Sequence, residues 1–460
     1  MAKFNQPGSR AVVSSPIRST ADPTATTYEG APGFTREPKG ELFLLAVSNM
    51  VGEDTYYESA GDRDDRFRRL VRQVATADGG WTLEFLRWLR SEGNMRSAPL
   101  VAAAEAVHAR LAEEEGDRTA NRSLIDAVLQ RADEPGEMLA YWISRFGRNV
   151  PKPVKRGVAD AVARLYDERA LLKYDADSRG LRFADVLELV HVTATHPQIK
   201  GTWRGDLFEH AIDRRHDLDN PIPESLGVLR RRAELMALPV GDRRAALNPD
   251  TLRAAGMTWE ALAGWLQGPM DAAAWSAVIP SMGIFSLTRN LRNFDEAGVP
   301  DDVAATVAAL LSDPDVIARS RMLPMRFLAA YRAAPSLRWG HALEQALGHS
   351  LANVPTLAGR TLILVDRSGS MRDTMSDRSD LTRGDAAAIF GTALALRAEH
   401  ADLVQFGTTS SKIELGLGQS LLRAIDKFGW LGGTATADAV RRWYRDGFHS
   451  RVVIVTDEQA

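Results

Sequence analysis

Apolar residues recur at helical spacing over most of the chain, from Glu37 to Gly348. Runs such as LFLLAVSNMVG, WTLEFLRWLRSE and APLVAAAEAVHARL place apolar side chains three and four positions apart, and Pro and Gly stand between the runs. A spacing of this kind builds one apolar face on a helix. We therefore expect this part of the chain to be almost entirely helical.

Two segments of the helical region show the same order of elements. LEFLRWLRSEGNMRSAPLVAAAEAVHARL, from Leu83, and LAYWISRFGRNVPKPVKRGVADAVARLY, from Leu139, both predict a helix, a turn with Gly, a Pro and an Ala/Val-rich helix. A single helix pair cannot bury its own apolar face, so recurrence predicts stacking into a HEAT-like α-solenoid. Only two copies are clear, and an irregular helical domain stays open as the alternative.

The pattern changes at Arg360. Short apolar runs, TLILVD, DLVQFG and RVVIVTD, alternate with helical segments such as DAAAIFGTALALRAEH, SLLRAIDKFGW and ADAVRRWYRDG, and KIEL is a candidate short strand. Strands that alternate with helices predict a doubly wound α/β domain with a parallel sheet. The sequence thus predicts a disordered tail over 1–34, a helical domain over 35–350 and an α/β domain over 351–460. The chain stops three residues after Asp457, so we expect that domain to lack its C-terminal part.

Composition narrows the possible functions. The 460 residues carry 57 Lys and Arg against 60 Asp and Glu, a net charge of -3, so any nucleic-acid site has to be a local basic patch. There is no cysteine, which excludes disulfides, thiolate metal sites and cysteine nucleophiles. The sequence shows neither a signal-peptide core nor a long apolar run. We expect a cytoplasmic protein with no membrane partner.

Oxygen-bearing side chains follow the predicted strands at their carboxyl ends, where open α/β sheets place their ligands. Asp366, Ser368 and Ser370 come directly after the first strand, Thr434 follows Gly432 and Gly433, and Asp457 ends the last strand. An all-oxygen set with few charges suits Mg²⁺ or another hard divalent cation. Alternatively, the hydroxyls only cap helices and turns. No His or Cys accompanies the set, so we expect no catalysis by this chain.

These five residues resemble the metal-ion-dependent adhesion site of the von Willebrand factor A domain at every position. The resemblance implies that the metal recruits a carboxylate from an external partner.

Two basic windows stand out in the helical half. RFGRNVPKPVKRG holds Arg145, Arg148, Lys152, Lys155 and Arg156 without an acidic residue, and Arg321 and Arg326 lie in the acid-free segment ARSRMLPMRFLAAYRAAPSLRWG. Basic patches bind phosphates through counterion release, and Arg near aromatic residues can stack on unpaired bases. Taken alone, each window is more often a solvated helix face.

The segments TREPKGELFLLAVSNMVGEDTYYE, NVPKPVKRGVADAVARLYDERALLKYDADSRGLRFADVLELVHVTATHP, WSAVIPSMGIFSLTRNLRNFDEAGV and SRMLPMRFLAAY resemble the TROVE module of Ro proteins, in which an A domain directly follows. The resemblance implies a monomeric ring of HEAT-like helix pairs closed by the A domain. It implies binding of unpaired 3′ ends of misfolded small non-coding RNAs in the hole and of Y RNA outside it. It further implies a role in RNA quality control, an exoribonuclease tethered through Y RNA, and no DNA partner.

By matching motif, the resemblance places on the RNA-facing surface the residues Lys152, Lys155, Arg156, His191, Arg289, Asn290 and Arg292. His191 could instead be a satisfied histidine in a helix interface. Two other functions stay open: a metal-dependent protein-interaction scaffold that binds no RNA, and a metal-assisted nuclease, which the lack of a dense carboxylate and His cluster disfavours.

Overall fold

The computed structural model describes residues 24–26, 32–33, 35–48, 59–113, 120–176, 178–192, 199, 202–354, 356–375, 380–416 and 420–457. Most of the tail predicted to be disordered, 1–34, lies outside these ranges; β1 (Ala25–Thr26) and β2 (Pro32–Gly33) pair antiparallel within it. Contacts divide the chain into two compact units, Thr35–Ala261 and Leu262–Ala460 with Met1–Phe34. The domain bounds predicted from the sequence, 35–350 and 351–460, instead mark where helices give way to a sheet. They stay a prediction.

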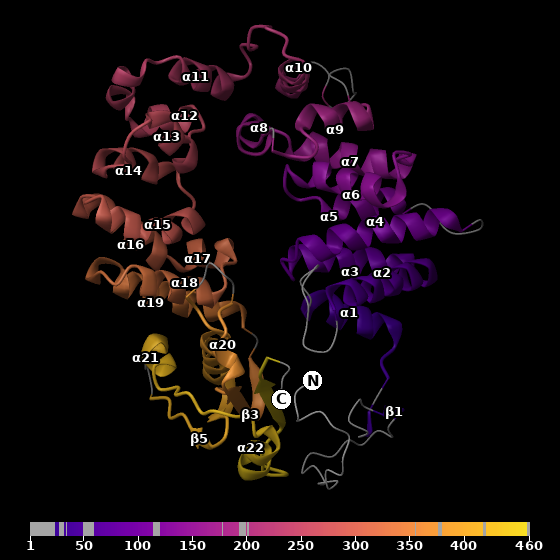
Figure 1. Cartoon of the computed structure of the whole chain (residues 1–460), viewed down its shortest axis with the longest axis vertical. Helices are drawn as coiled ribbons and strands as arrows, with labels where there is room; N and C mark the ends of the chain where they lie inside the picture. The colour runs from indigo at the N-terminus through magenta and orange to yellow at the C-terminus, as the bar shows by residue number, and fades with distance from the viewer. Residues whose placement is uncertain are drawn as a thin grey trace. The chain divides into compact units, whose positions relative to one another are not determined.

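The first unit is built from helices, as the periodicity predicts (Figure 1). Its elements are α1 (Pro38–Ser48), α2 (Ala60–Ala77), α3 (Gly79–Ser91), α4 (Ser97–Ala112), α5 (Asn121–Val128), α6 (Glu134–Phe146), α7 (Lys152–Leu165), α8 (Glu168–Tyr174), α9 (Phe183–Val190), α10 (Trp203–Arg215), α11 (Gly227–Met236), the 3₁₀ helix η1 (Val240–Ala246) and α12 (Pro249–Ala254). The two similar sequence segments form the helix pairs α3/α4 and α6/α7, so the expected helix–turn–helix units are present.

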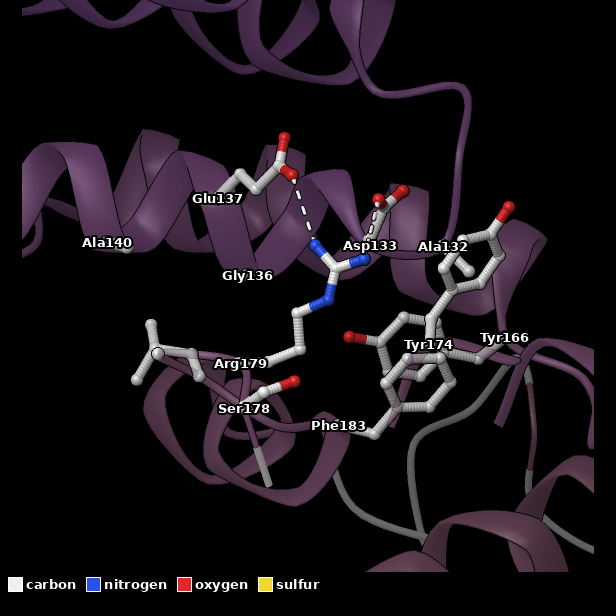
Figure 2. Close-up of a pocket in the computed structure, with 12 residues that line it drawn as sticks. Ala132, Asp133, Gly136, Glu137, Ala140, Tyr166, Tyr174, Ser178, Arg179 and Phe183 are labelled. Carbon is white, nitrogen blue, oxygen red and sulfur yellow. Dashed lines mark ion pairs between the residues drawn. The ribbon is translucent and has the colours of Figure 1, made fainter. Parts of the chain in front are cut away.

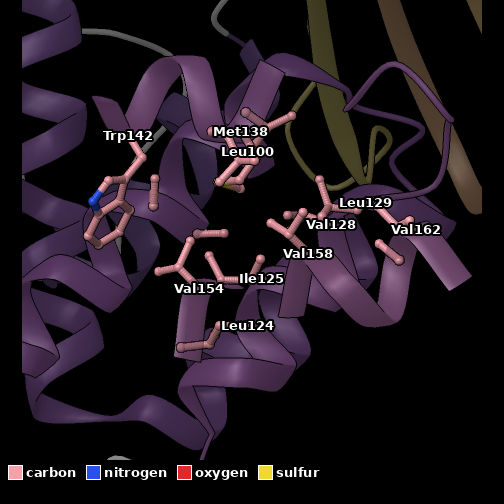
Figure 3. Packing of buried hydrophobic residues seen from close by; sticks show 14 of the residues in the cluster. Leu100, Leu124, Ile125, Val128, Leu129, Met138, Trp142, Val154, Val158 and Val162 are labelled. Atoms are coloured by element: carbon pink, nitrogen blue, oxygen red, sulfur yellow. The ribbon is translucent and has the colours of Figure 1, made fainter. Parts of the chain in front are cut away.

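One continuous apolar core runs through the stacked helices of this unit. Figure 3 shows part of it, where Ile125 of α5, Met138 of α6 and Val158 of α7 pack together. Gly157 allows α5 and α7 to approach, because a Cβ there would lie 2.6 Å from the carbonyl oxygen of Arg122 and 2.7 Å from Ile125 Cβ. The burial of these faces between neighbouring helices supports the stacked-pair interpretation of the sequence.

Two buried carboxylates tie the helices together. Glu134 is fully buried and binds the Arg90 guanidinium through both of its oxygens at 2.9 Å, which joins α6 to α3. Glu105 of α4 is also fully buried; it accepts a hydrogen bond from the Tyr141 hydroxyl at 2.8 Å and pairs with Arg72. Buried charges are tolerated only when paired and hydrogen-bonded, and both are.

The second unit begins with helices and ends with a sheet. The helices are α13 (Trp259–Leu266, whose first residues belong to the first unit), α14 (Ala272–Val278), η2 (Ile279–Ser281), α15 (Ile284–Glu296), α16 (Asp301–Ser312), α17 (Pro314–Ser320), α18 (Pro324–Ala333), α19 (Leu337–Ser350) and η3 (Leu351–Asn353). The sheet region holds β3 (Leu357–Asp366), η4 (Ser370–Arg372), α20 (Arg383–Arg397), β4 (Ala398–Phe406), β5 (Ser410–Lys412), α21 (Leu421–Ile425), α22 (Thr436–Trp443) and β6 (Arg451–Val455).

The sheet has helices on both faces and the strand order β5-β4-β3-β6. Leu362, Leu364 and Phe406 pack toward Ala439 of α22, whereas Gly391 of α20 lies against Val365 on the other face. β3 pairs parallel with both β4 and β6. The predicted fold class, a helical region followed by a doubly wound α/β domain, is confirmed. The ring implied by the family resemblance stays a prediction.

One predicted strand and one predicted helix of the sheet region need correction. The strand after β4 is Ser410–Lys412, which begins two residues before the KIEL run and shares only Lys412 with it. It pairs antiparallel with β4, so the sheet is mixed. A tight turn connects β4 to β5, and a turn that short permits only antiparallel pairing. The segment SLLRAIDKFGW, predicted as one helix, is helical only over Leu421–Ile425.

An ion pair joins the helical and sheet parts of the second unit. Arg332 of α18 donates to both oxygens of Asp385, near the start of α20, at 2.7 and 3.0 Å. Burial raises the pKa of the Asp385 carboxyl, but the hydrogen bonds from Arg332 and Thr382 outweigh it and hold that pKa below its ordinary value.

No helix in the described ranges has the length and apolar character to cross a membrane.

Candidate functional site

The N-terminus of α7 carries three of the predicted basic residues. Pro151 stands at the N-cap without a side-chain capping bond, and Lys152 and Arg156 are exposed on the first turns of this 14-residue helix. The first N–H groups of a helix and its dipole attract anions. The basic side chains and the helix end therefore favour negative charge at the same place.

A hollow of about 560 Å³ lies beside this helix end in the first unit. Its lining brings together Arg148, Lys155 and His191, which the sequence separates by up to 43 positions, and Arg215 of α10, which sequence reasoning missed. Lys155 Nζ lies 3.2 Å from His191 Nε2. His191 sits in the left-handed region, φ 59°, where α9 ends, so its exposed ring is presented by a helix terminus.

Ion pairing separates the cations of this surface into two groups. Of the two acids that line the hollow, Asp185 is paired with Arg215, whose Nε lies 2.9 Å away, and Glu188 is hydrogen-bonded to the His216 ring, whose Nε2 lies 2.7 Å away. Arg145 is likewise held by buried Glu105, at 3.4 Å. In the described part of the chain, the other four cations of this window have no acidic partner: Lys155 lies against the His191 ring, and Arg148, Lys152 and Arg156 are the remaining three. These three have uncompensated charge for an external anion.

A second basic cluster lies in the second unit around an exposed aromatic ring. Phe285 of α15 is 44% exposed, and the guanidinium carbons of Arg289 and Arg326 lie 5.7 and 5.9 Å from its ring centroid. Arg321 ends α17 in the left-handed region, and Arg292 lies 3.6 Å from Glu296. Sequence reasoning missed Phe285, although its spacing of four from Arg289 on a helix was a usable signal.

Asn290 is placed differently from the expectation of an RNA-facing side chain. It is only 3% exposed, its Nδ2 donates to the Ser286 carbonyl at 2.8 Å, and its Oδ1 accepts from Asn293 Nδ2 at 2.8 Å. The side chain points into α15's buried face because Leu287, Leu291 and Phe294 fix that face inward. Asn290 is therefore not available for direct contact with a ligand.

The loop after β3 arranges the first three predicted metal ligands. Asp366 is fully buried; its Oδ1 accepts from the Ser368 N–H at 2.8 Å, and its Oδ2 accepts from the Thr456 hydroxyl at 2.7 Å. The hydroxyl oxygens of Ser368 and Ser370 lie 3.3 Å apart. One carboxylate and two adjacent hydroxyls thus share one turn, which is a donor set that fits a hard divalent cation.

The remaining two predicted ligands reach the same sheet edge by other loops. The Gly369 N–H donates to the Gly432 carbonyl at 2.6 Å, so the loop that carries exposed Thr434 is tied to the loop that carries the serines. Asp457 follows β6, next to β3 in the sheet, but its Oδ2 lies 3.4 Å from Arg383 Nη1. The donor set of Asp366, Ser368 and Ser370 fits a cation, whereas the Asp457 carboxylate lies beside a guanidinium. Groups of three or more His, Asp or Glu in metal-binding geometry are absent from the described residues.

Comparison with known proteins gives a family match and a likeness to solved structures. Residues 255–359 match the TROVE domain, and this segment holds Arg289, Asn290, Arg292, Arg321 and Arg326. The chain is similar to the crystal structure of the Deinococcus radiodurans RO (RSR) protein, with a TM-score of 0.62 and 21% sequence identity over 86% of this chain and 80% of that chain. At this identity the likeness shows a shared fold. No curated protein matches the sequence.

Proposed function

Because the chain contains a TROVE domain and has the fold of a Ro protein, we propose that it binds RNA and holds the unpaired 3′ ends of structured small RNAs. The observation that carries this proposal is the convergence of Arg148, Lys155 and His191, from three separate elements, on one hollow in a chain with net charge -3. A protein with so little excess charge binds a polyanion only where local cations lack acidic partners.

The chemistry of the two clusters favours single strands over duplex. Uncompensated Arg148, Lys152 and Arg156 supply phosphate contacts, which position RNA without reading its sequence. Phe285 between Arg289 and Arg326 offers a stacking surface, and only an unpaired base exposes its face for stacking. Discrimination is then by strandedness more than by base sequence.

The finer roles follow from the Ro resemblance. We propose that the ligands are misfolded small non-coding RNAs and a Y RNA, that Y RNA links the protein to an exoribonuclease, and that the protein serves in RNA quality control as a non-catalytic scaffold. A ring closed by the A-type domain would confine the 3′ end to its hole.

The test compares one hairpin RNA with and without a single-stranded 3′ tail, across a salt titration. Tail-dependent binding that weakens steeply with salt is the expected result, because phosphate contacts release counterions. Weak binding that ignores the tail would contradict the proposed clamp.

A second candidate function rests on the loop after β3. Asp366, Ser368 and Ser370 would hold Mg²⁺, with Thr434 and Asp457 completing the set, and the bound metal would accept a carboxylate from a protein partner. This function predicts partner binding that Mg²⁺ removal abolishes and no affinity for RNA at low salt. The two functions use different side chains and can be tested separately.

A further inference from the structure

A buried guanidinium in the second unit is held without an acidic partner. Arg367 directly follows β3 and is 4% exposed; among the described residues no carboxylate forms an ion pair with it, and its buried Nη1 has no hydrogen-bond partner. By comparison, Arg179 of the first unit lies 3.7 Å from Asp133 and 3.6 Å from Glu137, as the dashed lines of Figure 2 mark. Burying a charge without a counter-charge is unfavourable, so another group has to stabilise Arg367.

That group is the indole ring of Trp430. The guanidinium carbon of Arg367 lies 4.0 Å from the ring centroid, and its Nε donates to the Gly429 carbonyl at 2.9 Å. Exposed Arg372 lies 5.2 Å from the same centroid. Gly384, in the first turn of α20, leaves room for both side chains, because a Cβ there would lie 2.7 Å from Arg367 Nη1 and 2.8 Å from Trp430 Cη2. Of the aromatic side chains, indole stabilises a cation over its face best.

This contact joins the two loops that carry the predicted metal ligands. Arg367 stands between two of these ligands in the chain, and Trp430 precedes Thr434 in the loop between α21 and α22. The backbone makes the same connection, because the Leu431 N–H donates to the Arg367 carbonyl at 2.9 Å. The position of Arg367 therefore affects the ligands on both sides of it, and Trp430 fixes that position from the other loop.

We propose that Trp430 is a positioning residue of the metal site: by holding the Arg367 guanidinium, it keeps the loop of Thr434 aligned with the loop of the serines and so sets the affinity for a divalent cation. The inference rests on the second candidate function, the metal-dependent one. The indole offers no ligand oxygen, so its effect on the metal passes through the two loops. Residues that orient metal ligands typically change metal affinity by about 10- to 100-fold when they are replaced.

The test measures the Mg²⁺ affinity of the full chain by isothermal titration calorimetry. Trp430→Leu should bind Mg²⁺ about tenfold more weakly than wild type, because the guanidinium loses the ring that holds it. Trp430→Phe keeps an aromatic face over Arg367 and should bind within about threefold of wild type. The melting temperature in EDTA reports the stability of the fold separately. A lower melting temperature in EDTA with unchanged Mg²⁺ affinity, or a loss of affinity that Phe does not rescue, would overturn the positioning role.

Trp203→Leu is the matched control. Trp203 is 38% exposed, as Trp430 is, and the guanidinium carbon of Arg204 lies 4.6 Å from its ring centroid, but it belongs to α10 of the first unit. This variant should keep the Mg²⁺ affinity of wild type, and a loss equal to that of Trp430→Leu would contradict the inference. Tetrafluorotryptophan at position 430 is the second variant, in case Trp430→Leu does not fold. It keeps the shape of the ring and removes its negative face, so Mg²⁺ binding should weaken; unchanged binding would mean that the ring does not act through the guanidinium.

A double-mutant cycle with Thr434→Ala shows whether the effect passes through the loop of Thr434. If Trp430 aligns that loop, then Trp430→Leu should weaken Mg²⁺ binding by less than about twofold once the Thr434 hydroxyl is gone, because the two changes remove the same interaction. Losses that simply add would overturn the inference.

Asp366→Ala separates this inference from the function on which it rests. Mg²⁺ binding that Asp366→Ala abolishes and Trp430→Leu leaves unchanged would overturn the positioning role and leave the metal-dependent function standing. Absence of Mg²⁺ binding in wild type would overturn that function and the inference with it.

Discussion

Removal of the cations at the start of α7 should weaken RNA binding and make the affinity depend less steeply on salt concentration. The perturbation is the triple variant Lys152→Ala, Lys155→Ala and Arg156→Ala. Lys152 and Arg156 are exposed, and Lys155 Nζ lies 3.2 Å from the His191 ring, so among the described residues the substitutions leave no acid without its partner. Surface changes of this kind alter stability by about 0.5 kcal/mol or less, so folding should be intact.

The magnitude follows from counterion release. Each phosphate contact on a single strand contributes about -0.7 to the slope of log affinity against log salt concentration. Three lost contacts should make the slope shallower by about 2. If both proteins bind equally near 1 M salt, that slope difference corresponds to an affinity loss of about 100-fold at 0.1 M.

The assay is fluorescence anisotropy of a labelled, 3′-tailed hairpin between about 50 and 300 mM salt. The control is the triple variant Arg87→Ala, Arg122→Ala and Arg253→Ala, which removes the same charge from half-exposed side chains already paired with Glu84, Asp160 and Asp250. The control should keep a slope close to wild type. An unchanged slope in the α7 variant, or an equal change in the control, would refute the assignment of phosphate contacts to this helix end.

Three further predictions concern the metal site and the packing. Mg²⁺ should raise the melting temperature of wild-type protein by binding the folded state, and Asp366→Ala should abolish the rise; an equal rise in the variant would mean that the metal binds elsewhere. Arg332→Ala should lower the unfolding free energy by about 2 kcal/mol near pH 7 in urea titrations, because buried Asp385 loses its partner. The pKa of Asp385 in the folded protein lies below its ordinary 3.8, so the ion pair stabilises the fold above that pH. The difference in unfolding free energy between variant and wild type should therefore shrink as the pH falls below 3.8. A difference that stays constant with pH would contradict the role of the pair. Gly157→Ala should lower the unfolding free energy by about 1–3 kcal/mol, because the added Cβ would overlap Ile125 and the α5 backbone. An unchanged unfolding midpoint would show that α5 and α7 can move apart at little cost.

Local patterns determined the secondary structure and one loop. The spacing of apolar residues predicted the helices, and α3/α4 and α6/α7 appear where the repeated segments predicted them. Asp366, Ser368 and Ser370 are close in sequence and share one turn, so their proximity could be foreseen. In these cases the controlling interactions are short-range, and a few neighbouring residues suffice to specify them.

Tertiary structure decided which side chains are available. The same basic window contains Arg145, which buried Glu105 holds, and Arg156, which has no acidic partner in the described ranges; their sequence neighbourhoods do not distinguish them. Asn290 turned out to be buried because apolar neighbours fix the inward face of its helix. Burial and ion pairing depend on contacts between residues distant in sequence, and periodicity and composition do not encode those contacts.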